Sequence, residues 1–218
     1  MQAQGPAGGE PNLSGDAMPA TDDQIREKYL ERAIRELNSL SREIQSCEYC
    51  PRGNLMPVLG SGHPQADVML LKYAPTVAEI EEGVAFYGRS GSALMKSLKR
   101  LGIDPLAVYG TLCVKCPVGD PSLADPACLA RIVEELAIVQ PKMVAIMGPD
   151  ALACLNDADV PLAESVQPAL GVVQRFTPSI EALYVPSIDD SLDEEASKRA
   201  FWSSFRVLGD WYADLPPY

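Results

Sequence analysis

Four short apolar runs, separated by helical patterns, constrain the fold of this chain more than any other feature. They cover residues 67–72, 107–113, 142–148 and 182–186. Each run is almost continuously apolar, which is typical of strands that are buried on both faces of a parallel sheet. We therefore predict the α/β class, as a three-layer α/β/α fold with a short, mostly parallel four-stranded sheet.

Helical patterns lie before, between and after these runs, at residues 21–47, 90–102, 125–141 and from 191 onward. The first and last are predicted to begin at capping boxes, at Thr21 and Ser191, each with a glutamine or glutamate three positions later. We expect residues 21–214 to form a single domain. Residues 1–20 are rich in Gly, Pro and Ala and are expected to form a disordered extension.

The composition excludes several classes of protein. A hydrophobic share of 47% favours a packed globule over a disordered chain. No apolar run approaches the roughly 20 residues that a membrane helix needs, so we expect no membrane association. The first residues lack the basic and apolar regions of a secretory signal, and a cytoplasmic location is the resulting expectation.

The charge distribution bears on nucleic-acid binding. The formal net charge is −12, whereas contacts to phosphates depend on lysine and arginine. The acids are concentrated in the flanks, because residues 181–195 hold six acids and no base, while residues 52–115 hold seven bases and five acids. DNA therefore remains a candidate partner, and the acidic C-terminal segment would suit a basic protein partner.

Six cysteines in an apparently cytosolic chain point to free thiols or a bound metal and not to a disulfide framework. Cys47 and Cys50 form a C-x-x-C-P motif after the first predicted helix, a spacing at which two thiolates can bind one metal centre. A redox dithiol is disfavoured, because the pair follows a helix instead of opening one. The other two ligands are either Cys113 and Cys116, as in a zinc site, or Cys116 and Cys128. Spacing alone leaves both pairings open.

The order of these motifs resembles that of the iron–sulfur uracil-DNA glycosylases of the family 4 type. Over residues 40–187 the chain has C-x-x-C, an A-P loop, F-x-G-x-x-G, V-K-C-P and a cysteine in the next helix. The resemblance implies a structural [4Fe–4S] cluster, with zinc as the alternative, and it makes Cys113 a buried thiol like Cys154. The implied ligands are Cys47, Cys50, Cys116 and Cys128.

The resemblance also implies a base pocket at the carboxyl ends of the strands, where ligands of parallel sheets bind. Phe86 matches the residue that stacks on a base flipped out of DNA, and Glu79 matches an acidic residue of the family. The pocket residues implied in this way are Tyr73, Ala74, Pro75, Glu79, Phe86, Leu112 and Val185.

Three departures from the family pattern affect the expected activity. The loop reads Lys72-Tyr73-Ala74-Pro75-Thr76 in place of G-E-A-P-G, Leu112 replaces an asparagine, and Val185 replaces the histidine of H-P-S. Each change removes a group able to support charge in the reaction, so catalytic residues remain unassigned and uracil excision is expected to be impaired. The resemblance therefore implies a uracil-DNA glycosylase-like protein that acts on DNA. The alternative is a catalytically inactive descendant that binds a small ligand or a protein partner.

Overall fold

The central layer of the fold is a six-stranded, mostly parallel sheet. The computed structural model describes residues 21–216, and the predicted extension at residues 1–20 lies outside this range. The strand order is β1-β3-β2-β4-β6-β5, and the four central strands are parallel. These are β3 (Val108–Leu112), β2 (Val68–Lys72), β4 (Met143–Met147) and β6 (Glu181–Val185). The α/β prediction is confirmed, and each predicted strand agrees to within one residue at either end.

Two edge strands were not predicted. β1 (Ser61–Gly62) pairs antiparallel with β3, and β5 (Val173–Arg175) pairs antiparallel with β6. Segments of two and three residues are too short to show a periodic pattern in the sequence. The sheet therefore has six strands where four were expected, and it is parallel only in its centre.

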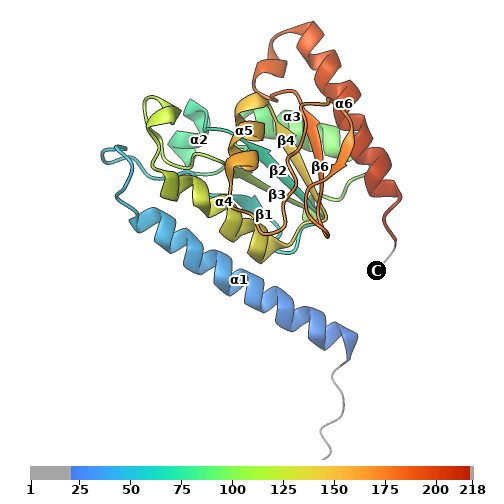
Figure 1. Ribbon diagram of the computed structural model, residues 1–218, viewed down its shortest axis with the longest axis horizontal. Coiled ribbons are helices and arrows are strands. Elements are labelled where there is room, and N and C mark those ends of the chain that lie inside the picture. Colours follow the sequence, from blue (N-terminus) through green and yellow to red (C-terminus); the bar gives the residue numbers. More distant parts are fainter. Residues whose placement is uncertain (1–20, 217–218) are drawn as a thin grey trace, which may run out of the picture.

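Helices cover both faces of this sheet (Figure 1). α4 (Pro126–Val139) and α5 (Pro149–Asp157) lie on one face, and α3 (Arg89–Arg100) and α6 (Glu195–Ala213) lie on the other. α1 (Asp22–Ser46) packs against the outer side of α4. The remaining elements are α2 (Val77–Glu82) and the 3₁₀ turns η1 (Pro105–Ala107), η2 (Pro121–Leu123) and η3 (Asp190–Leu192). Within residues 21–216, no helix has the length and apolar character needed to cross a membrane.

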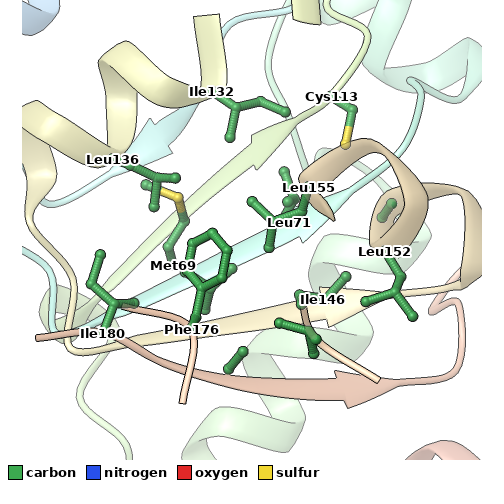
Figure 2. Close-up of a cluster of buried hydrophobic side chains, with 14 of the residues drawn as sticks. Met69, Leu71, Cys113, Ile132, Leu136, Ile146, Leu152, Leu155, Phe176 and Ile180 are labelled. Atoms are coloured by element: carbon green, nitrogen blue, oxygen red, sulfur yellow. The ribbon is translucent and has the colours of Figure 1, made fainter. Parts of the chain in front are cut away.

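The two cores follow from the alternation of side chains along each strand. In β2, Met69 and Leu71 point into the core beneath α4 and α5, which Figure 2 shows together with Ile132, Leu152 and other buried residues. Their neighbours Val68 and Leu70 point into the opposite core, beneath α3 and α6. This alternation decides which residues at the strand ends can meet.

The predicted start of the first helix is confirmed, and that of the last helix is wrong. Thr21 forms the predicted capping box of α1 with Gln24. The capping box predicted at Ser191 is wrong, because α6 begins only at Glu195. The hydroxyl of Ser191 instead donates to the carbonyl oxygen of Ser187 at 2.6 Å, and Ser191 belongs to η3.

Candidate functional site

Four side chains form a row at the carboxyl edge of the parallel sheet. Lys72 of β2 pairs in register with Leu112 of β3 and with Met147 of β4, and Met147 pairs with Val185 of β6. Strand alternation places all four on the face that packs toward α3 and α6. Ligands of parallel sheets bind outside this edge, so the row and the loops above it form the candidate binding site.

The ammonium group of Lys72 is buried in this row and bonded to two carboxylates. Lys72 is only 3% exposed, and its Nζ lies 2.7 Å from Oε2 of Glu79 and 2.8 Å from Oδ2 of Asp189. Such partners are required, because a buried charge without a partner is strongly destabilising. The two ion pairs connect the end of β2 to α2 and to the turn before η3.

Glu79 organises the loop around the site. It is fully buried, and its Oε2 accepts hydrogen bonds from the backbone amide and the hydroxyl of Thr76 at 2.7 and 2.8 Å. Its Oε1 accepts a bond from the backbone amide of Phe86. Thr76 is the N-cap of α2, so the same carboxylate closes the capping box of that helix. Glu79 is therefore held by four donors, counting Lys72, and is not a solvated surface acid.

Phe86 is held in one defined position. Its backbone has a φ of 58°, a left-handed conformation that is strained for a phenylalanine. Its ring lies over Gly110 of β3, where the Cβ of any other residue would be 2.5 Å from Cδ2 of the ring. The Nζ of Lys72 lies 5.5 Å from the ring centroid, within the range of a cation–π contact. The ring is therefore bordered by the sheet and by a buried cation.

The A-P loop follows Lys72, and its first residue, Tyr73, points to the opposite face of the sheet from Lys72. Tyr73, Ala74 and Pro75 are half-buried between β2 and α2. The side chain of Tyr73 packs against the core beneath α4 and α5, which also contains Cys113 and Cys154, and burial raises its pKa. Tyr73 therefore faces away from the row that contains Lys72.

Leu112 and Val185, the two apolar replacements, both lie in the row at the strand ends. Leu112 is fully buried and clusters with Phe86, and Val185 is fully buried in the core beneath α3 and α6, against which Phe86 also packs. Neither side chain can donate or accept a hydrogen bond. The charged groups paired beside these side chains are those of Lys72, Glu79 and Asp189.

A second site lies at the start of α4, where three buried cysteines meet. The sulfur atoms of Cys50, Cys116 and Cys128 all lie within 4.8 Å of one another, and those of Cys116 and Cys128 are 3.9 Å apart. Thiolates are ligands of zinc and of iron–sulfur clusters, so the donor set fits either group. Of the two pairings open in the sequence, the structure brings Cys116 together with Cys128.

Two other cysteines lie outside this group of three. Cys47 is half-buried at the C-cap of α1, three positions before Cys50, and is near enough in sequence to supply a fourth ligand. Cys113 is fully buried in the core beneath α4 and α5, which also contains Cys154.

Backbone amides face the clustered sulfurs. The amide of Asp125 donates to Sγ of Cys50 at 3.4 Å, and the backbone amides of Lys115 and Cys116 lie close enough to Sγ of Cys128 to favour its thiolate. Contact with the neighbouring Cys116 thiol, and then these amides, lower the pKa of Cys128 to about 5, while the same contact raises the pKa of Cys116 and burial raises that of Cys50. Since metals bind the thiolate, donors of this kind favour the metal-binding form of Cys128.

A buried ion pair supports the loop that carries Cys116. Lys115 is fully buried, and its Nζ bonds Oε2 of Glu135, Oγ1 of Thr111 and the carbonyl oxygen of Leu112, at 2.7 to 2.8 Å. Glu135 of α4 also accepts bonds from the hydroxyls of Thr111 and Tyr109. All three donors of the ammonium group are satisfied, so the pair connects the end of β3 to α4.

The sequence analysis did not identify the two buried lysines as parts of these sites. A signal was present, because Lys72 and Lys115 each stand alone as a cation in an otherwise apolar stretch, VMLLK and LCVKC. Such a cation must find a buried acid. Asp189 gave no comparable signal, because it is one of six acids within residues 181–195.

Comparisons with known proteins agree with this arrangement. The family model of the Uracil DNA glycosylase superfamily matches residues 59–205. A Type-4 uracil-DNA glycosylase of Pyrobaculum aerophilum is 32% identical over 123 residues, 52% of this chain and 61% of that protein. One of Sulfurisphaera tokodaii is also 32% identical over 123 residues, 51% of this chain and 54% of that protein. The chain thus spans less than two thirds of the length of either relative.

A third relative is matched over most of its length. The Type-4 uracil-DNA glycosylase of Archaeoglobus fulgidus is 24% identical over 190 residues, which is 81% of this chain and 94% of that protein. The superfamily match extends from the loop before β1 into α6 and so includes every strand of the sheet. On the strength of this match, together with the three-layer fold and the site at the carboxyl edge, the chain belongs to the uracil DNA glycosylase superfamily.

Proposed function

We propose that the chain is an iron–sulfur protein of this superfamily, with a [4Fe–4S] cluster bound by Cys47, Cys50, Cys116 and Cys128. Three of these sulfurs already lie within 4.8 Å of one another, and a backbone amide donates to that of Cys50. When bound, the cluster supplies a structural crosslink between the end of α1, the loop after β3 and the start of α4. Zinc is the alternative, since it accepts the same four thiolates.

Metal analysis of protein purified without oxygen tests this assignment. The cluster predicts iron and sulfide in equal amounts and a brown absorbance, whereas zinc predicts neither. Cys128→Ser should lose the metal, because it removes one of the three clustered sulfurs. Cys113→Ser is the matched control, a buried thiol outside the group, and it should keep the metal. Loss of metal from Cys113→Ser alone would overturn the ligand set.

We further propose that the chain acts on DNA at the carboxyl edge of the sheet, in the manner of a base-excising enzyme but with a rebuilt pocket. Supporting this, Phe86 is fixed beside the strand ends, where it could stack on a base taken out of the duplex. The local charge also permits DNA, since Asp189 and Asp193 of the acidic segment already pair with Lys72 and Arg89.

The single observation that decides the expected rate is the position of Lys72. Its ammonium group lies 5.5 Å from the Phe86 ring and is held there by Glu79 and Asp189. A base that stacks on this ring must displace or share that buried cation. Leu112 and Val185 offer no hydrogen bonds to the base. Since electrostatic stabilisation is often the largest catalytic contribution, we expect wild-type excision of uracil to be slow.

The test is base excision by metal-loaded protein on oligonucleotides that contain uracil, hypoxanthine or xanthine, both single- and double-stranded. Lys72→Ala removes the cation from the ring, while Glu79 keeps three donors from Thr76 and Phe86. Lys72→Ala should bind the oligonucleotides more tightly and excise the base faster than the wild type. The control Lys96→Ala, at an exposed position, should match the wild type. Equal activity of all three proteins would show that Lys72 does not obstruct the site.

A second candidate function is a catalytically inactive protein that binds a small ligand or a protein partner. The observation that favours it is the same buried network, because an ion pair that already fills a site leaves little space for a base. It predicts no excision by Lys72→Ala and no binding of oligonucleotides at low salt, where phosphate contacts are strongest.

A further inference from the structure

Arg52 lies in the loop that carries the C-x-x-C motif and is bonded almost entirely to backbone. Its Nη2 donates to the carbonyl oxygens of Gln45 at 3.0 Å and Cys47 at 2.9 Å, and its Nη1 donates to that of Leu55. These bonds fold the loop back onto the end of α1. They also fix the peptide that follows Cys47, the cysteine that stands outside the group of three sulfurs.

One donor of this guanidinium has no partner. Nε of Arg52 is buried, and within residues 21–216 it is the single buried side-chain nitrogen or oxygen that makes no hydrogen bond. A buried donor left without a partner is destabilising, and more so when it is charged. Such a group calls for an explanation, and a ligand of the site is one.

The surroundings of Arg52 point to sulfur as the missing acceptor. The loop contains Cys47 and Cys50, and the sulfur of Cys50 already accepts a hydrogen bond from the amide of Asp125. The buried lysine near these sulfurs, Lys115, has its three donors occupied by oxygen atoms. Arg52 is partly exposed, but its buried Nε is a donor to spare in this region.

We propose that Nε of Arg52 donates a hydrogen bond to a sulfur of the bound metal group, either the Cys47 thiolate or a sulfide of the cluster. Arg52 is then a positioning residue with two effects. It orients the Cys47 arm through the carbonyl bonds, and it withdraws electron density from the sulfur. Mutating a residue that hydrogen-bonds a metal ligand typically lowers the metal affinity by about 10- to 100-fold. Hydrogen bonds to cluster sulfurs also set the reduction potential. This inference rests on the proposed metal centre.

The experiment compares metal-loaded wild type with Arg52→Gln, Arg52→Lys and the control Arg42→Gln, whose side chain is exposed on α1. The first measurement is the Fe–S stretching frequencies by resonance Raman, which requires no electron transfer. The second is the midpoint potential from an anaerobic titration, and the third is the rate of iron release to a chelator. Both Arg52 variants should shift the Fe–S stretches, lower the midpoint potential and release iron about 10- to 100-fold faster. Arg42→Gln should match the wild type.

Other outcomes overturn specific parts of the inference. Unchanged stretches and potential, with only faster iron release, would mean that Arg52 ties the loop through carbonyls alone. If Arg52→Gln does not bind iron, the Fe–S stretching frequencies and the midpoint potential of Arg52→Lys decide instead. Absence of iron in the wild type would overturn the cluster itself, an outcome distinct from a normal cluster that is insensitive to Arg52.

Discussion

Replacing Lys115 by methionine tests how much the buried ion pair beneath the cysteine loop contributes to stability. The side chain of Lys115 is 0% exposed and that of Glu135 is 2% exposed, with 2.8 Å between Nζ and Oε2. Methionine fills a similar volume but leaves the carboxylate of Glu135 with only the hydroxyls of Tyr109 and Thr111. Breaking one side of a buried pair costs about 3–5 kcal/mol, so we expect a loss of that size.

The second half of the test replaces both partners. Lys115→Met with Glu135→Leu removes the uncompensated charge, and exchanges of this kind range from neutral to about 1–4 kcal/mol stabilising. The double variant should therefore recover most of the loss seen in Lys115→Met. The assay is urea unfolding of metal-loaded protein without oxygen, followed by circular dichroism. Lys96→Met, at an exposed position of α3, is the control and should change stability by less than about 0.5 kcal/mol.

Two results would contradict this prediction. In one, Lys115→Met unfolds at the same urea concentration as the wild type; in the other, the double variant is as unstable as the single one. The first result would mean that water reaches Glu135 in the absence of the lysine. The second would mean that the hydrogen bonds to Thr111 and Leu112 matter more than the charge of Glu135.

Two further predictions concern Tyr109 and its neighbour in β3. Burial, and then the charge of Glu135, raise the pKa of Tyr109 above its usual 10.0, so above that pH the unfolded chain releases a proton that the folded protein keeps. Because the unfolded state then binds fewer protons, stability should fall by about 1.4 kcal/mol per pH unit. Tyr109→Phe should lack this component when urea unfolding is compared at about pH 9 and about pH 11. Gly110→Ala places a Cβ 2.5 Å from the Phe86 ring and should cost about 1–3 kcal/mol, measured by the same unfolding assay; an unchanged midpoint would mean that the ring moves freely.

The parallel core of the fold could be predicted because its signals are local and redundant. β2 and β4 are almost entirely apolar on both faces, which is typical of strands in a buried parallel sheet. The short edge strands β1 and β5 could not be predicted, since two or three residues are too few to show a periodic pattern. The start of α6 was wrong because the hydroxyl of Ser191 bonds a carbonyl of the preceding turn, a competition that local pattern does not reveal.

The candidate site was predictable only in outline. Strand order places Leu112 and Val185 at one edge, and the register confirms that they share a row with Lys72. The sequence could not show that Lys72 reaches Asp189, 117 positions away, because ion pairs across a sheet depend on side-chain direction. Nor could it show that Tyr73 faces the core beneath α4 and α5, since the A-P motif does not indicate which face of the sheet each side chain takes.

The short distance along β3 between the two sites has a consequence for how this region can vary in length. Leu112 lines the carboxyl edge and Cys116 joins the cysteine group, with the Lys115 ammonium bonded back to the Leu112 carbonyl oxygen. Deleting or inserting one residue within 112–116 would displace either Leu112 or Cys116, because the bonds of Lys115 to Thr111, Leu112 and Glu135 fix the length of chain between the end of β3 and α4. Length changes should therefore be absent from this segment and tolerated in the exposed loops, and any variant here has to be assayed for metal as well as for DNA.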